Sequence, residues 1–332
     1  MERLKSSTVT LWVSVNLLIF FTSDMTLAAN LMRAVMDQNV VSVYDDDGVF
    51  LHYSYKDVPF KPYVKELFTP GGVNVLLDAP ADHLHHHALM FAVTADGVDF
   101  WAEQSAAGGP GRQAHQRFDH VTVDSRDDAP FAGFSEQLDW QNPQSGQLVL
   151  KEIRTIGICN LAEPNAVLLT WQSQFETPNA KESVTLSGSH YQGLGMRFVR
   201  SMDLDGEFRN ADGKEGTVFR GEERLVRSRW CAYTARVDGK DVTVAMFDHP
   251  RNERHPATWF MMNKPFAYFS ATLALHEQPL EVEVKSGKPL VLRYGVALWD
   301  GRIENAKIEE LYKRWAALPQ QTEGSPKPQP EK

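Results

Sequence analysis

The sequence predicts an all-β protein, a large antiparallel β-sandwich with one C-terminal helix. Many short apolar or alternating runs are separated by turn pairs such as Asp-Gly, Asn-Pro and Ser-Gly. Short strands at this spacing are typical of sandwiches and barrel-like domains. Neither a repeat of fixed period nor an alternation of strands with helices is present, which argues against Rossmann and TIM architectures.

The predicted strands follow one another along most of the chain. Residues 39–55 contain two alternating runs around Asp-Asp-Asp-Gly, which predicts a β-hairpin. The runs HALMFAV and VDFWAE flank TADG and predict a second hairpin of the same kind. The further predicted strands are residues 147–161, 166–177, 196–202, 229–237, 242–247, 266–275 and 289–299. At residues 303–318 the apolar residues recur at mostly helical spacing, which predicts a helix packed on a sheet.

Both ends of the chain are expected to lie outside the folded domain. Arg3 and Lys5 precede an apolar run at residues 8–21, and Thr26-x-Ala28 offers a small-x-small cleavage site, as in a secretory signal peptide. The run is shorter than the roughly 20 residues that a membrane-spanning helix needs. We therefore predict a signal peptide (1–29), a single β-sandwich domain (30–318), a disordered tail (319–332) and a periplasmic or secreted location.

Charge and cysteine content narrow the range of partners. A formal net charge of -9 and the lack of a basic run argue against a nucleic-acid partner. No later segment is long and apolar enough to cross a bilayer, so no membrane contact is expected after signal cleavage. Cys159 and Cys231 lie in apolar, strand-like runs and are predicted to be buried thiols. The alternative is a disulfide between them, which an exported protein could form.

The segment DHLHHHALMF at residues 82–91 holds four of the eleven histidines. If it is extended, His83, His85 and His87 share one face and His86 points to the other. Two imidazoles in a His-x-His pattern can bind one divalent metal. The residues available elsewhere as further ligands are His190, His249 and Glu103. Without a metal, the imidazoles can act as general acid or base, or orient a sugar hydroxyl; an exposed turn that binds nothing is the third reading.

Two further segments place polar residues at strand ends. In VTVAMFDHPRNERHPATWF, a strand ends in Asp248 and His249, and the carboxylate could orient the imidazole. An Asx-turn at Asp248 with an exposed His249 is the alternative. In SHYQGLGMRF, His190 precedes a turn and Arg197 follows it, where its guanidinium could bind a carboxylate or hydroxyl-rich ligand or form a surface ion pair.

Glycine and tryptophan residues near these segments each have two possible roles. Gly193 and Gly195 indicate a bulge or a close backbone approach. Trp101, beside Glu103, and Trp259 could stack on sugar rings, but tryptophans of a β protein are more often part of the core.

Three motifs resemble a known family. DHLHHHALMFAVTADGVDFWAE, HYQGLGMRF and FDHPRNERHPATWF, in this order, are similar to the secreted PmoA-like family, a bacterial domain of unknown function historically labelled "methane oxygenase". The resemblance covers residues 39–315. The family's usual first motif reads Asp-His-Pro-His-His-Arg-Gly. This chain keeps its Asp and three His as Asp82, His83, His85 and His86, and has Leu84, His87 and Ala88 where Pro, Arg and Gly are usual.

The resemblance implies a supersandwich similar to galactose mutarotase, in proteins that commonly occur beside sugar-processing genes. It does not imply a methane monooxygenase subunit, which needs several membrane-spanning helices that this chain lacks after its signal peptide. Fold alone does not dictate function.

We therefore expect a carbohydrate-active enzyme that hydrolyses, eliminates or epimerises at a sugar carbon by histidine acid–base chemistry. The residues expected to carry the chemistry are His85, His86, His190, Asp248 and His249. The residues expected to bind the carbohydrate, or another small polar ligand, are His83, Trp101, Glu103, Arg197, Asn252 and Trp259. No isolated pair of carboxylates stands out, which disfavours a two-carboxylate glycosidase. The alternatives are a non-catalytic glycan-binding module and a metal-dependent enzyme with histidine ligands; no cofactor follows from the sequence.

Overall fold

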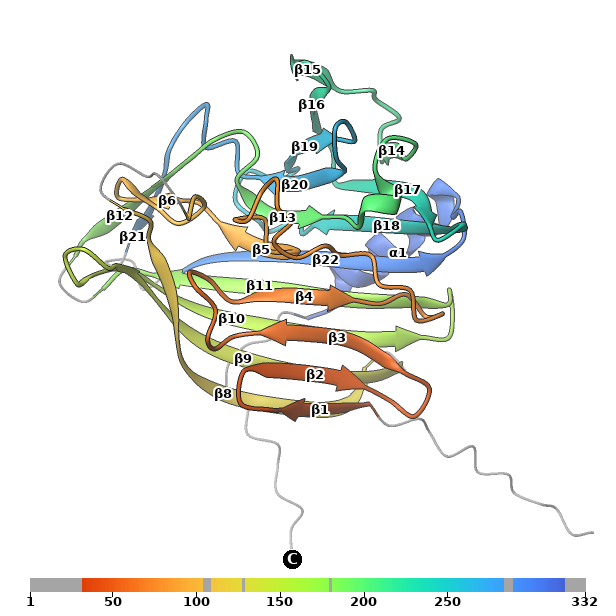
Figure 1. Cartoon of the computed structure of the whole chain (residues 1–332), viewed down its shortest axis with the longest axis horizontal. Helices are drawn as coiled ribbons and strands as arrows, with labels where there is room; N and C mark the ends of the chain where they lie inside the picture. The colour runs from red at the N-terminus through yellow and green to blue at the C-terminus, as the bar shows by residue number, and fades with distance from the viewer. Residues whose placement is uncertain (1–31, 104–108, 127–128, 179–180, 284–288, 320–332) are drawn as a thin grey trace, which may run out of the picture.

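The computed structural model describes residues 32–103, 109–126, 129–178, 181–283 and 289–319. The predicted signal peptide (1–29) and nearly all of the predicted tail (320–332) lie outside this range. Two antiparallel sheets, of ten and eight strands, overlie each other in Figure 1, and a four-stranded sheet lies at their left end. The predicted all-β sandwich with a C-terminal helix is confirmed. No helix in the described ranges is long and apolar enough to cross a membrane.

The ten-stranded sheet contains the predicted hairpin at residues 39–55, now β2 and β3. Asp45 Oδ1 accepts hydrogen bonds from the backbone N–H groups of Asp47 and Gly48, which stabilises the turn between them. In sheet order the strands are β1 (Arg33–Met36), β2 (Val40–Tyr44), β3 (Val49–Ser54), β4 (Tyr63–Leu67), β5 (Leu89–Ala92), β13 (Gly193–Arg197), β20 (Tyr268–Thr272), β19 (Thr258–Met262), β16 (Glu223–Arg227) and β15 (Thr217–Arg220).

The eight-stranded sheet holds most of the other predicted strands. Its strands in order are β14 (Glu207–Asn210), β17 (Trp230–Val237), β18 (Lys240–Asp248), β22 (Leu290–Asp300), β11 (Ala166–Glu176), β10 (Gln147–Leu161), β9 (Ala129–Asn142) and β8 (Arg112–Arg126). The four-stranded sheet consists of β21 (Leu280–Glu283), β12 (Ser183–Ser187), β6 (Thr94–Ala95) and β7 (Val98–Asp99). The strand predicted at 196–202 instead ends at Arg197, and a 3-10 turn follows at Arg200–Met202.

The main core lies between the two large sheets. Phe91 of β5 contacts Trp140 and Phe175 of the eight-stranded sheet, with ring centroids 6.3 and 5.4 Å apart. Phe269 of β20 likewise contacts Phe208 of β14 at 6.1 Å. Because side chains alternate along a strand, Tyr268 must point to the opposite, outer face of the ten-stranded sheet. This outer face carries the candidate site.

The single described α-helix, α1 (Asn305–Ala317), confirms the helix predicted at 303–318. It packs on the outer face of the eight-stranded sheet and lies at the right of Figure 1. Trp315 contacts Phe247 of β18 at a ring distance of 5.7 Å, and its Nε1 donates to Thr170 Oγ1 at 3.0 Å. A second core, separate from the main one, therefore forms under the helix.

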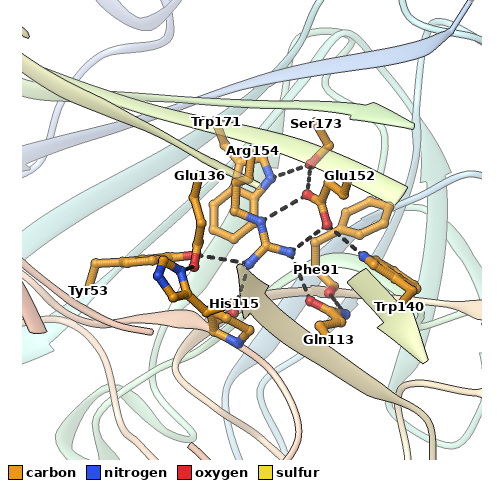
Figure 2. Close-up of polar contacts among 11 residues, drawn as sticks. Tyr53, Phe91, Gln113, His115, Glu136, Trp140, Glu152, Arg154, Trp171 and Ser173 are labelled. Carbon is orange, nitrogen blue, oxygen red and sulfur yellow. Dashed lines mark hydrogen bonds and ion pairs between the residues drawn. The ribbon is translucent and has the colours of Figure 1, made fainter. Parts of the chain in front are cut away.

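A buried arginine joins the two sheets through the network shown in Figure 2. Arg154 of β10, which is fully buried, donates from Nε and Nη2 to the two oxygens of Glu152 at 2.9 and 2.8 Å. Its Nη1 donates across the sandwich to Tyr53 Oη of β3 at 3.1 Å and to the carbonyl of Pro62 at 2.9 Å. Gln113 of β8 accepts a further bond from Nη2 at 2.8 Å.

The carboxylates around Arg154 have further partners. Glu152 accepts hydrogen bonds from Trp140 Nε1 at 2.9 Å and Ser173 Oγ at 2.6 Å. A second buried carboxylate, Glu136, accepts a hydrogen bond from Tyr53 and lies 2.6 Å from His115 Nδ1. Burial nevertheless raises the pKa of Glu136. The core thus contains a polar network whose charges compensate one another.

Cys159 and Cys231 form no disulfide, which confirms the prediction of two buried thiols. Cys231 Sγ lies 3.4 Å from Met261 Sδ in the core, and burial raises the pKa of its thiol. Cys231 is therefore not suited to act as a thiolate nucleophile.

Candidate functional site

The histidine-rich segment forms turns on the outer face of the ten-stranded sheet, directly before β5. The backbone N–H of His83 donates to Pro80, and that of His86 donates back to His83. This turn geometry corrects the extended segment considered above. It brings the rings of His83 and His85 to 4.6 Å from His86 and to 5.7 Å from each other. Three imidazoles thus share one side, and His87 has separate partners.

His86 is the buried member of the three. Its ring stacks on Tyr268 of β20 at 5.2 Å and meets Phe266 and Trp101 edge-on at 5.7 and 6.0 Å. Its Nδ1 has no hydrogen-bond partner among the described residues. Burial is the main reason that its pKa falls from 6.5 to about 2. His86 is therefore a neutral part of the aromatic floor beneath His83 and His85.

We expect His86 to keep its neutral imidazole throughout the neutral and mildly acidic range. The folded state resists protonation, whereas the unfolded chain takes up the proton near pH 6.5, so His86 lowers protein stability as the pH falls below about 6.5. Imidazole NMR of ¹⁵N-histidine protein, with a His86→Gln variant for assignment, measures the titration. A midpoint for His86 near 6.5 in the folded protein would contradict this account.

Gly195 of β13 makes room for this floor. A Cβ at Gly195 would lie 1.8 Å from Tyr268 Oη, and one at Gly193 would lie 2.2 Å from the backbone oxygen of Ala271. The close backbone approach predicted here is confirmed at Gly193, whereas Gly195 is approached by a side chain. Because the His86 ring stacks on Tyr268, Gly195 positions the histidine cluster indirectly.

Gly195→Ala is expected to lower the free energy of unfolding by about 1–3 kcal/mol, the usual cost of forcing extra atoms into a packed interior. The displaced Tyr268 ring should also change the environment of His86. Urea denaturation and imidazole NMR report the two effects. Gly48→Ala is the matched control, since a Cβ there meets nothing within 4 Å. Equal stability of the two variants would show that Tyr268 moves without cost.

His87 lies in a buried charged network. Its Nδ1 is 2.9 Å from Asp78 Oδ1, its Nε2 is 2.9 Å from Glu103 Oε1, and its ring stacks on Tyr63 at 4.5 Å. Burial alone would lower the pKa of His87, but the bonds to the two carboxylates outweigh it and the pKa is raised. Lys61, whose side chain is fully buried, binds Glu103 and donates to the carbonyl of Trp101 at 3.3 Å.

The structure thereby adds Lys61, Tyr63 and Asp78 to the predicted surroundings of the cluster. Tyr63 Oη donates to Asp78 Oδ2 at 2.8 Å. None of the three belongs to a motif, and Lys61 and Tyr63 lie far from the histidines in the sequence. The only sequence signal was the position of Asp78 shortly before the histidine segment.

Arg197 is a buried cation of the cluster, and its ion pair reaches the exposed carboxylate of Asp82. Its guanidinium lies 3.9 Å from the ring centre of Phe266, and its Nη2 lies 3.5 Å from Asp82 Oδ2. Asp82 also contacts Arg200 at 3.3 Å and His83 Nδ1 at 3.1 Å. The exposed Asp82–His83 pair is thus held by two arginines at the rim of the site.

His190 lies on the same face but has its own partners. Tyr191 lies between His190 and the histidine cluster, because its ring is 5.3 Å from Trp101 and 5.1 Å from His190. His190 Nε2 is 3.1 Å from Glu223 Oε2, and its Nδ1 is 3.1 Å from Ser189 Oγ. Phe219 of β15, the edge strand at the top of Figure 1, stacks on the imidazole at 3.7 Å.

Asp248 and His249 lie beside α1 on the eight-stranded sheet. Asp248 orients His255 Nδ1 at 2.7 Å, instead of His249, and accepts further bonds from Asn252 and the backbone of Ala257. His249 is buried against the helix end, with Nε2 3.2 Å from the carbonyl of Ala316. The described contacts do not join these residues to His86 or His190.

The three predicted segments therefore do not converge on one cleft. The structure brings together His83, His85, His86, Trp101 and Arg197, with Glu103 adjacent and His190 one aromatic residue away. The end of β18 is instead held to neighbouring segments by the hydrogen bonds of Asp248, His249 and Asn252. Trp259 is fully buried and donates from Nε1 to the carbonyl of Ser228, which makes it part of the core.

A metal site does not follow from this geometry. Among the described residues, no group of three or more His, Cys, Asp or Glu side chains is arranged to hold a metal ion. In the cluster His83 stacks on His86, whereas His85 meets both rings edge-on.

Comparison with known protein families matches residues 40–313 to a family model. The chain belongs to DUF6807, a family of unknown function. This match does not show the resemblance to the PmoA-like family that the motifs indicated, so that resemblance stays a prediction. No curated protein sequence matches this DUF6807 chain.

Solved structures of similar fold include two from lactobacilli. The alpha-galactosidase from Lactobacillus brevis has a TM-score of 0.45 and 6% identity over 86% of this chain and 42% of its own length. The chain thus spans less than half of that enzyme. A galactose mutarotase related enzyme from Lactobacillus acidophilus has a TM-score of 0.34 and 10% identity over 82% of this chain and 97% of its own.

Proposed function

We propose that the protein is a carbohydrate-active enzyme that moves protons on a neutral sugar held against His83 and His85. The observation that carries the proposal is that these two partly exposed imidazoles lie side by side, with their rings 5.7 Å apart. His83 is paired with the Asp82 carboxylate through Nδ1. His85 has no hydrogen-bond partner among the described residues, and burial lowers its pKa.

The two imidazoles suit the two halves of a proton transfer. His85, neutral at neutral pH, can accept a proton from a sugar hydroxyl or an acidic C–H. His83, whose Nδ1 is paired with Asp82, can return a proton from Nε2 when its ring carries both protons. Positioned acid–base groups of this kind typically accelerate a reaction by about 10²–10⁴-fold. Epimerisation, ring opening and elimination all use such a pair.

The balance of charge favours a neutral ligand. The positive groups described around the cluster are Lys61, Arg197 and Arg200, and His87 joins them when it is protonated. The negative groups are Asp78, Asp82, Glu103 and Asp203. Because charges of both signs surround the cluster, a charged ligand gains little net attraction, whereas sugar hydroxyls can use the polar rim.

The proposal includes export of the protein. The apolar run at residues 8–21 and the Thr26-x-Ala28 site support a cleaved signal peptide and a periplasmic or secreted enzyme. N-terminal sequencing of the native protein tests this part, and an intact Met1 on the mature chain would contradict it.

The experiment uses D-glucose, D-galactose, their methyl glycosides and D-glucuronate as probes. We expect calorimetry to show binding of at least one neutral sugar, weaker binding of the glucuronate, and turnover of the bound sugar by NMR. His85→Ala should retain binding within a few-fold and lose turnover. Binding without turnover, insensitive to pH, would instead indicate the glycan-binding module. If none of the neutral sugars binds, the proposal is wrong.

A further inference from the structure

Beyond the sugar site, we propose that Ser189, His190 and Glu223 form a second catalytic site, in which Ser189 is the nucleophile that cleaves a short-chain acyl ester. The three side chains are in contact in the order that such a site needs. Ser189 Oγ lies 3.1 Å from His190 Nδ1, and His190 Nε2 lies 3.1 Å from Glu223 Oε2. A nucleophile within hydrogen-bond reach of a base, which a third group orients, is the general signature of an activated serine.

One tautomer of His190 satisfies both contacts. If Nε2 carries the proton, it donates to the Glu223 carboxylate, and Nδ1 is left to accept the hydroxyl proton of Ser189. Burial lowers the pKa of His190, so the neutral base form is present at neutral pH. Geometry and protonation state therefore agree on the same role.

Surrounding residues hold this base in place. Arg220 Nη2 donates to the other oxygen of Glu223 at 2.6 Å, which fixes the carboxylate and leaves Oε2 for the imidazole. Phe219 covers one side of the His190 ring at 3.7 Å, and His276 lies edge-on at 6.1 Å. The imidazole is buried, whereas Ser189 is partly exposed and can be reached by a substrate.

The backbone around Ser189 offers donors for a developing oxyanion. Ser189 and His190 follow the end of β12 at Ser187, outside the sheet ladder. The backbone N–H groups of both residues have no acceptor among the described residues. Unpaired N–H groups beside the nucleophile are the donors that stabilise a tetrahedral intermediate. Because Phe219 and His276 flank the imidazole, a small acyl group is the substrate expected to fit beside Ser189.

The proposed reaction follows from these positions. Ser189 Oγ attacks the ester carbonyl carbon while its proton passes to His190 Nδ1. The bond between that carbon and the alcohol oxygen then breaks, and the alcohol leaves with the proton from Nδ1. Water, deprotonated by the same nitrogen, attacks the acyl-serine and releases the carboxylic acid, which restores Ser189.

The test combines an activity-based probe with ester hydrolysis on the full-length protein. A fluorophosphonate should phosphonylate the wild-type protein once, and peptide mapping should place the adduct on Ser189. The protein should also hydrolyse p-nitrophenyl acetate. Ser189→Ala should abolish labelling and lower the hydrolysis rate by about 10²-fold or more. Ser187→Ala is the matched control, two residues earlier in β12, and should behave as wild type.

Glu223→Gln separates catalysis from folding. This variant should still be labelled on Ser189, but more slowly, and circular dichroism should show the wild-type fold for all three variants. A wild-type protein that takes up no probe, or hydrolysis that survives Ser189→Ala unchanged, would overturn the proposal. Because His83 and His85 take no part in it, either outcome leaves the proposed sugar chemistry untouched.

Discussion

Arg154→Met is expected to lower the free energy of unfolding by about 3–5 kcal/mol, the range found when one partner of a buried ion pair is removed. The methionine fills much of the volume, but Glu152 loses both of its guanidinium bonds and becomes an uncompensated charge in the core. Tyr53 Oη and the carbonyl of Pro62 lose their donor as well. Urea denaturation at neutral pH measures the loss.

Two comparisons make this result specific. Arg117→Met removes an arginine from β8 that is 65% exposed and paired with Asp119, so it should change stability by at most about 1 kcal/mol. The deficit of Arg154→Met should also shrink at acidic pH, because a carboxylate left without its cation takes up a proton more readily. A deficit equal to that of Arg117→Met would show that the network in Figure 2 contributes little.

The Arg154 network also contacts chain segments that lie next to the candidate site. The carbonyl of Pro62 lies between Lys61, which binds Glu103, and Tyr63, which stacks on His87. Gln113 Nε2 donates to the carbonyl of Phe91 in β5, directly after the histidine segment. The buried network therefore contacts the segment that carries Lys61 and Tyr63, and strand β5, which follows the histidine turns.

His85→Ala is expected to reduce turnover of the neutral sugar identified by calorimetry by about 10²–10⁴-fold, the usual contribution of a positioned base. The variant should fold normally because His85 lies at a partly exposed turn. In the wild type the loss of rate on acidification should begin only below pH 6.5, since burial holds the pKa of His85 under its ordinary value and the imidazole must be neutral to accept a proton.

His120→Ala provides the control for this loss. His120 is an exposed histidine on β8, in the other sheet, and its removal should leave turnover unchanged. If His85→Ala retains the wild-type rate, or if the rate rises as the pH falls through the range below 6.5, His85 is not the base.

Most of the fold could be predicted from the sequence because hydrophobic alternation is a local property. Strand β10 matches its predicted range, and the hairpin of β2 and β3 follows from the turn residues between them. Strand β8 was not predicted: it lies at the sheet edge, and its sequence RQAHQRFDHVTVDSR is too polar to indicate a strand. The inward direction of Arg154 was equally hidden: its charge partner Glu152 lies two residues away in the same strand, but Tyr53 and Gln113, which complete its hydrogen bonds, come from distant strands.

The site could be predicted only where its residues are neighbours in the chain. The histidine segment indicated the cluster, because its turns bring His83, His85 and His86 together locally. Lys61 and Asp78 meet His87 and Glu103 through sheet packing, which no local pattern reports. Asp248 beside His249 looked like an oriented imidazole, but the carboxylate binds His255, seven residues further on.

The central claim is that a sugar binds against His83 and His85, and imidazole NMR tests it most directly. Protein labelled with ¹⁵N-histidine is titrated with the neutral sugar that binds in calorimetry, and His83→Gln, His85→Gln and His249→Gln variants assign the signals. The account predicts that the resonances of His83 and His85 shift with the sugar's own binding curve, while His249 beside α1 does not move. Unchanged signals of His83 and His85 at saturation, or a shift confined to His249, would contradict it.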